Sequence, residues 1–156
     1  MRRLPLALAL VFLVGRNSQS QSTAADQATN QTTPNAESIA YCDLLAQSER
    51  FNGQTIRVQA VYETDFEESV ITSPSCPTPL PMIWVTFEGQ WESRTKRSVR
   101  KAVTKAKWRV PLDVVFVGKF KTDGKYGHMD MYPLSFEVYQ VEAARASKGK
   151  KKPPKP

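Results

Sequence analysis

Five short segments with the residue pattern of β-strands constrain the fold of this 156-residue chain more than any other feature. In Thr55–Glu63, apolar and polar residues alternate, which is typical of a strand buried on one face. The other four segments are Ser69–Thr72, Met82–Phe87, Leu112–Lys121 and Leu134–Glu142. With 40% hydrophobic and 24% charged residues, the chain is expected to form one globular domain and not a multi-domain enzyme, a membrane-spanning bundle or a coiled coil.

Two further segments have apolar residues at helical spacing and are expected to be helices, namely Glu37–Ser48 and Trp91–Trp108. The predicted order is therefore helix, three strands, helix and two strands. That order is the layout of the five-stranded antiparallel oligonucleotide/oligosaccharide-binding barrel, the OB-fold. We therefore expect a mostly β fold with two helices and an OB-like barrel. An open α+β sheet with the same order is the alternative, because the sequence does not show whether the sheet closes.

A set of short motifs occurs in a fixed order along this region: Tyr41–Leu44, Phe51–Val58, Ser73–Cys76, Ile83–Val85, Val117–Phe120 and Tyr126–His128. The ordered set resembles a group of small exported bacterial proteins of unknown function that are expected to have OB-like barrels. In layout alone, the chain also resembles the periplasmic bacterial OB-fold proteins linked to envelope stress. The resemblance implies a fold, but it supplies no catalytic residue.

The first twenty residues have the layout of a secretory signal peptide. Arg2 and Arg3 precede the apolar run Leu4–Gly15, which is too short to span a bilayer, since a spanning helix needs roughly 20 residues. A cleavage after Ser20 would leave residues 21–36 as a disordered spacer without large apolar side chains. We expect export, with a periplasmic or extracellular location. An uncleaved interfacial anchor is the alternative.

The net charge of +7 comes from the ends of the chain. Residues 36–146 carry 14 basic and 14 acidic residues, so the predicted OB-like domain, residues 37–146, is neutral. The segment 147–156 carries five lysines and three prolines and is expected to be a disordered basic tail. Within the domain the charge is polarised: residues 37–92 hold nine acidic and two basic side chains, whereas residues 93–146 hold five acidic and twelve basic ones.

Cys42 and Cys76 are the only cysteines in the chain. In an oxidising compartment they are expected to form a disulfide, which would close a loop of about 34 residues and stabilise the fold by roughly 4 kcal/mol. A reactive thiol pair is the alternative, but the Cys-x-x-Cys spacing of such pairs is absent.

Basic residues recur at three- and four-residue spacing on one face of the predicted helix over residues 91–108: Arg94, Arg97, Lys101 and Lys105. They are candidates for binding an anionic polymer or a membrane surface, together with the lysine tail. The alternative is that a helix capping the barrel needs a solvated charged face. Sequence-specific nucleic-acid binding is not expected, because no base-stacking aromatic residues lie beside these charges.

Three further residues are candidates for ligand binding. Strand alternation in Met82–Phe87 points Trp84 outward, on the strand pair where OB-folds bind their ligands. Tyr126 and His128 lie between the last two strands, in one of the two binding connections of that fold. The alternatives are that Trp84 lies beneath the first helix or the spacer, and that His128 only hydrogen-bonds backbone.

No metal site or cofactor site is expected. His128 and Asp130 provide too few metal ligands by themselves. The acidic segment Glu63–Glu68 lacks the spacing and the central glycine of a calcium loop, so it is interpreted as a solvated hairpin tip. The chain also has no nucleophile elbow and no phosphate-binding loop.

The sequence therefore favours a non-enzymatic, exported, OB-like domain that binds an unidentified ligand or partner in the cell envelope. The alternative is an electrostatic binder of an anionic polymer or a membrane surface, acting through the basic helix and the lysine tail.

Overall fold

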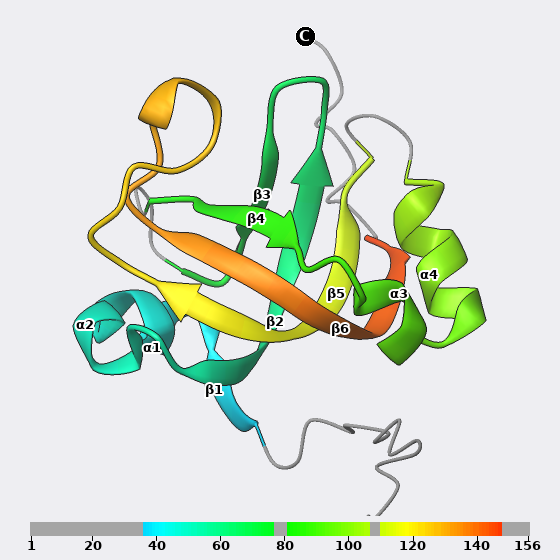
Figure 1. Cartoon of the computed structure of the whole chain (residues 1–156), viewed down its shortest axis with the longest axis horizontal. Coiled ribbons are helices and arrows are strands. Elements are labelled where there is room, and N and C mark those ends of the chain that lie inside the picture. The colour runs from blue at the N-terminus through cyan, green and yellow to red at the C-terminus, as the bar shows by residue number, and fades with distance from the viewer. Residues whose placement is uncertain (1–35, 77–80, 107–109, 148–156) are drawn as a thin grey trace, which may run out of the picture. The chain divides into compact units, whose positions relative to one another are not determined.

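The computed structural model describes residues 36–76, 81–106 and 110–147 (Figure 1). The predicted signal peptide, nearly all of the spacer and the basic tail from residue 148 onward lie outside the described residues. Within the described ranges, no helix is both long enough and apolar enough to cross a membrane.

Five strands form a closed barrel: β2 (Thr55–Thr64), β3 (Ser69–Thr72), β4 (Ile83–Phe87), β5 (Leu112–Lys121) and β6 (Ser135–Ala146). Their order in the sheet is β2-β3-β4-β6-β5, and β2 pairs again with β5 from Thr55 opposite Lys119 to Tyr62 opposite Leu112. The barrel is OB-like, as predicted, and the alternative of an open sheet is wrong. It is mixed rather than purely antiparallel, because β4 and β6 run parallel.

The last two strands contact each other most extensively, and their pairing contains two irregularities. The register shifts between Val115 and Phe116 and again between Val117 and Gly118. A Cβ atom on Gly118 would lie 2.2 Å from the carbonyl oxygen of Glu137 on β6. Only glycine therefore allows the two backbones to approach this closely at this position.

The segment expected to be the first helix begins as a strand. Residues Glu37–Ala40 form β1, which pairs parallel to β2, and only then do α1 (Tyr41–Ala46) and α2 (Ser48–Phe51) follow. Pairing with β2 places Ile39 opposite Val58, in the core. Burial of Ile39 therefore outweighs the helical spacing of this segment. A disulfide joins Cys42 of α1 to Cys76, as predicted.

The expected second helix is interrupted at Thr95. Because the first helical segment is also divided, into α1 and α2, the described residues contain four α-helices instead of two. The two pieces are α3 (Trp91–Arg94) and α4 (Arg97–Thr104), and Thr95 between them has the extended conformation φ −107°, ψ 133°. The buried Thr95 hydroxyl accepts a hydrogen bond of 3.0 Å from the backbone N–H of Val141 on β6. Satisfying this buried donor outweighs continuation of the helix.

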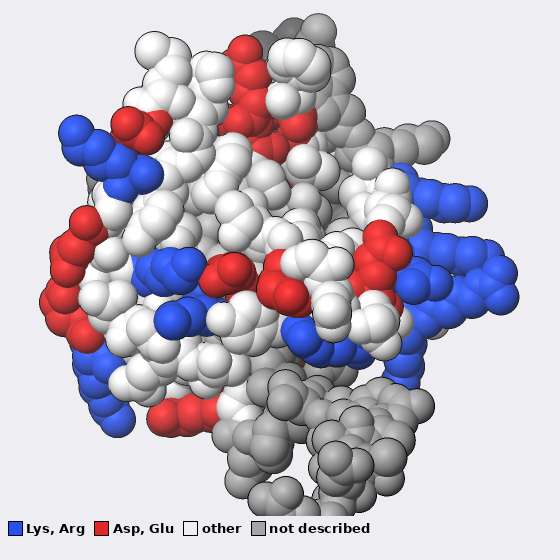
Figure 2. Space-filling model, viewed as in Figure 1, with Lys and Arg blue, Asp and Glu red and all other residues white. Residues whose placement is uncertain are grey.

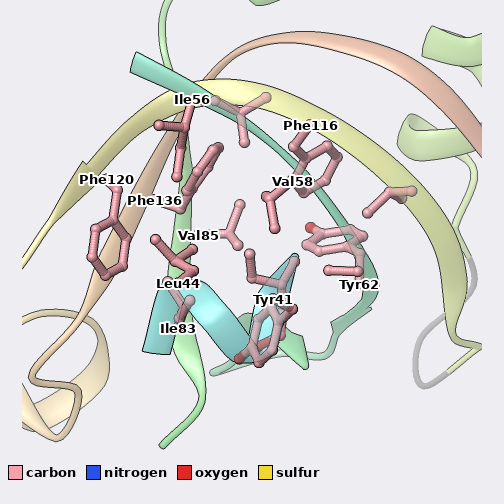
Figure 3. Close-up of a cluster of buried hydrophobic side chains, with 14 of the residues drawn as sticks. Tyr41, Leu44, Ile56, Val58, Tyr62, Ile83, Val85, Phe116, Phe120 and Phe136 are labelled. Atoms are coloured by element: carbon pink, nitrogen blue, oxygen red, sulfur yellow. The ribbon is translucent and has the colours of Figure 1, made fainter. Parts of the chain in front are cut away.

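The barrel interior is filled by aromatic and branched side chains from all five strands (Figure 3). Phe116, Phe120 and Phe136 are fully buried. Leu44 of α1 enters the same cluster, and Trp91 of α3 packs on Phe87 with ring centroids 4.8 Å apart. In Figure 1 the pair α1–α2 and the pair α3–α4 lie on opposite sides of the barrel. The outer surface of β3 and β4 is covered by neither pair.

Candidate functional site

The outward side chains of β3 and β4 form the centre of the candidate site, which we call the β3–β4 face. Ile83 and Val85 are buried in the core, so alternation along β4 turns Met82, Trp84 and Thr86 outward, as predicted. The strand register aligns one row of residues that point away from the core across four strands: Glu63, Val70, Trp84 and Ser135. Glu63 is exposed and Trp84 half-buried, whereas Val70 and Ser135 are buried. This row joins the end of β2 to the start of β6, and so brings the β2–β3 turn and the β5–β6 connection to the same part of the surface.

Trp84 lies under the β5–β6 connection. Its ring is 5.2 Å from the ring of Tyr132, with an interplanar angle of 41°. A Cβ atom on Gly127 would lie 2.5 Å from the indole ring, and Gly127 has φ +72°, ψ −162°, a conformation that is essentially restricted to glycine. Half-buried in this way, Trp84 serves as the platform on which the connection rests.

The β5–β6 connection is held at both its base and its side. At the base, the backbone N–H groups of Tyr126 and Tyr132 each donate to the other residue's carbonyl oxygen, at 2.9 and 3.2 Å. At the side, the Tyr132 hydroxyl donates a 2.8 Å hydrogen bond to the carboxylate of Glu68, beside the β2–β3 turn. Burial of the Tyr132 ring, and then the bond to Glu68, raises the pKa of the tyrosine to about 12. This hydroxyl is therefore a permanent donor at neutral pH and ties the two connections together.

Exposed apolar side chains gather on these same elements. Phe66 of the β2–β3 turn is 89% exposed, Met129 and Met131 of the β5–β6 connection are 78% and 66% exposed, and Met82 of the β3–β4 face is 40% exposed. Among the residues that the structure describes, only Val110 is a further large apolar residue with comparable exposure. We call Phe66, Met82, Met129 and Met131 the exposed apolar set.

Backbone strain accompanies this exposure. Met129 and Asp130 have φ values of 53° and 59°, within the left-handed region that residues other than glycine rarely adopt. They lie in η1 (His128–Asp130), at the tip of the connection. Strain of this kind persists only where the surrounding structure enforces it, and it is common at ligand-binding loops. Here the tip lies between Tyr126 and Tyr132, whose backbones are hydrogen-bonded to each other.

Carboxylates gather at the β2–β3 turn, which also carries Phe66. Glu63, Asp65, Glu67 and Glu68 lie at or beside the β2–β3 turn, and Figure 2 shows a patch of acidic side chains near the top of the view, where Figure 1 places the end of this hairpin. The Asp65 carboxylate accepts hydrogen bonds from the backbone N–H groups of Glu67 and Glu68, at 3.0 and 2.8 Å. A depression of about 270 Å³ lies between the turn and β4, lined by Glu63, Asp65, Glu68, Val70 and Met82 among others. In the described part of the chain, no three His, Cys, Asp or Glu residues are placed to hold a metal ion.

The other sequence-predicted ligand residues have different surroundings. The Tyr126 ring is half-buried and its hydroxyl donates to the carbonyl oxygen of Thr122, at 3.3 Å. His128 is exposed at the tip of the connection. The structure therefore brings Trp84 and the β5–β6 connection together, but through Gly127 and Tyr132, which sequence reasoning did not single out.

The predicted basic face is divided by the break at Thr95. Arg94 lies on α3, outside the helix that carries Arg97 and Lys101, and pairs with Glu88 at 3.0 Å. Lys105 lies directly after the last residue of α4. Arg97, Lys101 and Lys105 are exposed, and within the described ranges none of them forms an ion pair.

Comparison with known proteins finds no matching family model, no matching curated protein and no matching solved structure. Of the resemblance inferred from the sequence, the structure shows the closed barrel, and no family is identified.

Replacing Gly127 by Ala is expected to lower the free energy of unfolding by about 2 kcal/mol, because an L-residue is strained at this backbone conformation and its methyl group would strike Trp84. Urea denaturation followed by tryptophan fluorescence measures the change. Gly89→Ala is the matched control, since a Cβ atom there meets no atom within 4 Å. Equal stability of the two variants would contradict the packing described here.

Removing the Tyr132 hydroxyl is expected to change how stability depends on pH. A folded pKa of about 12 lies above the ordinary value of 10.0, so this hydroxyl stabilises the folded state fully below pH 10 and loses that contribution as pH rises through 12. The stability advantage of the wild type over Tyr132→Phe should therefore shrink from about pH 10 upward. Urea titrations at increasing pH measure this difference, and a difference that stays constant through this range would show that the hydroxyl is not buried against Glu68.

Proposed function

We propose that this protein is a non-enzymatic binding protein of the cell envelope, and that its ligand is a cationic chain with apolar side chains, such as a basic peptide segment. The ligand would dock on the β3–β4 face and contact the two connections that flank it. One observation carries the proposal: the exposed apolar set lies on these three elements, one of which, the β2–β3 turn, also carries a group of carboxylates. The same elements bind ligands in OB-folds generally.

The exposed apolar set supports an apolar component in the ligand. Single exposed apolar residues are normal on protein surfaces, but several on adjoining elements indicate an interaction site. Two of the four are methionines on a connection that is tied down at its base. Methionine side chains are flexible and polarisable, so they adapt to ligand side chains of different shapes.

The carboxylates support a cationic component. Glu63 and Glu67 are exposed and form no ion pair with any other residue that the structure describes. Negative charge at this position would repel the phosphates of a nucleic acid, which many OB-folds bind. It would attract lysine and arginine side chains instead. The depression of about 270 Å³ is small for an entire drug-sized ligand but large enough for one such side chain.

The link between Tyr132 and Glu68 supports a preformed site. It fixes the β5–β6 connection against the β2–β3 turn before any ligand arrives. Ordering these loops on binding would otherwise reduce the affinity.

The disulfide between Cys42 and Cys76 is compatible with an oxidising, exported location, periplasmic or extracellular. Export itself is part of the proposal and depends on the sequence of residues 1–20.

Fluorescence anisotropy with three short labelled peptides tests the proposed ligand chemistry. A peptide alternating Lys and Leu should bind more tightly than a Lys/Ser peptide, and a Glu/Leu peptide should not bind. The variant Glu63→Gln/Glu67→Gln should weaken binding of the Lys/Leu peptide by about tenfold at low salt, because two charge contacts are lost. Met129→Ser/Met131→Ser should weaken the Lys/Leu peptide and leave the Lys/Ser peptide nearly unchanged.

The matched control is Glu37→Gln/Asp43→Asn, which removes the same charge from β1 and α1. These two residues are exposed and form no ion pair within the described part of the chain. The proposal is wrong if this control weakens binding as much as Glu63→Gln/Glu67→Gln does. It is also wrong if the Lys/Ser peptide binds as tightly as the Lys/Leu peptide.

A further inference from the structure

We infer that α4 forms a second, independent binding surface, and that it fits a linear acidic polysaccharide. The surface consists of Arg97, Lys101 and Lys105, which we call the α4 cationic row. It shares no residue with the β3–β4 face, so it does not depend on the function proposed for that face.

Ion pairing distinguishes the row from the other two arginines of α3 and α4. Arg94 pairs with Glu88 at 3.0 Å, and Arg100 pairs with Glu92 at 3.7 Å and also donates to the Glu92 carbonyl oxygen at 3.3 Å. The carboxylates of Glu88 and Glu92 are therefore already paired. The described residues contain no carboxylate paired with any member of the row.

The helix sets the spacing of the three charges. Members four residues apart lie on the same side of a helix, separated by a rise of about 6 Å, so the row spans roughly 12 Å. Val103 belongs to the hydrophobic core, and the partly buried Val99 and Ala106 pack against the same core. These contacts fix the orientation of α4 on the barrel. Three like charges held in line repel one another, and a polymer with regularly spaced anionic groups would relieve that repulsion.

The chemistry around the row favours a polysaccharide over other polyanions. The exposed residues of α4 are Arg97, Ser98, Lys101 and Thr104, so α4 presents no exposed apolar side chain for insertion into a bilayer. A single-stranded nucleic acid would need an aromatic platform for its bases. The nearest described indole, that of Trp91, packs on Phe87 instead. A flexible acidic polymer without bases needs only the charges.

Figure 2 shows that the basic side chains over α4, at the right of the view, are separate from the acidic patch over the β2–β3 hairpin. A polyanion on α4 would therefore leave the acidic patch uncovered.

The test compares variants of equal net charge, because a basic protein can bind polyanions through any of its charges. The probe is a labelled heparin fragment, and the variants are Arg97→Gln/Lys101→Gln and the control Lys119→Gln/Lys125→Gln. The control residues form no ion pair in the part of the chain that the structure describes. The α4 variant should bind heparin about tenfold more weakly at low salt, and the slope of log affinity against log salt should fall by roughly 1.5, since two contacts are lost. The control should change affinity by less than about twofold.

Four outcomes would overturn the inference. Equal losses in the two variants would show that α4 is not special. Binding that disappears only when residues 148–156 are deleted would assign the polyanion to the tail. A thymidine oligonucleotide that binds more tightly than heparin through α4 would indicate a nucleic-acid surface. Phosphatidylglycerol vesicles that bind more tightly through α4 would indicate a membrane surface.

Discussion

Closure of the barrel by β2 is the constraint on which the rest of the structure depends. One edge of β2 pairs with β5, and the other pairs first with β1 and then with β3. Because the sheet closes, its apolar interior is shielded. The outer side of β3 and β4 therefore faces away from the core, and the β5–β6 connection packs there on Trp84. Closure also fixes the row of Glu63, Val70, Trp84 and Ser135, through which two connections distant in the sequence meet.

Acidic and basic side chains are unevenly distributed over the barrel, although their charges sum to zero. The domain is neutral, yet four acidic residues gather at or beside the β2–β3 turn, and the α4 cationic row, which forms no ion pair within the described ranges, lies on another part of the surface. Ion pairs such as Arg57 with Glu142 and Lys121 with Glu137 neutralise charges elsewhere on the barrel. The same chain could thus hold a cationic ligand on one surface and an acidic polymer on another, as we propose. Salt would lower the binding affinity of each surface, because the charges on both are exposed to solvent.

The sequence predicted the strands well, because period-two alternation reports burial directly. The predicted Ser69–Thr72 and Leu112–Lys121 match β3 and β5 at both ends. Helical periodicity gave wrong helix boundaries at two residues that make long-range contacts. Ile39 pairs with β2, and the Thr95 hydroxyl accepts a hydrogen bond from β6. In the candidate site, the outward direction of Trp84 was predictable. The packing of the β5–β6 connection on Trp84 was not predictable, because Gly127 and Tyr132 reach the indole through a loop conformation that no periodic pattern encodes.

The central claim is that ligands bind on the β3–β4 face and its two flanking connections. Amide chemical-shift mapping of the ¹⁵N-labelled protein, titrated with a peptide alternating Lys and Leu, tests it most directly. The account predicts saturable shifts concentrated in residues 63–70, 82–86 and 126–132, with α4 unaffected. Shifts concentrated on α4, or spread evenly over the barrel without saturation, would contradict it.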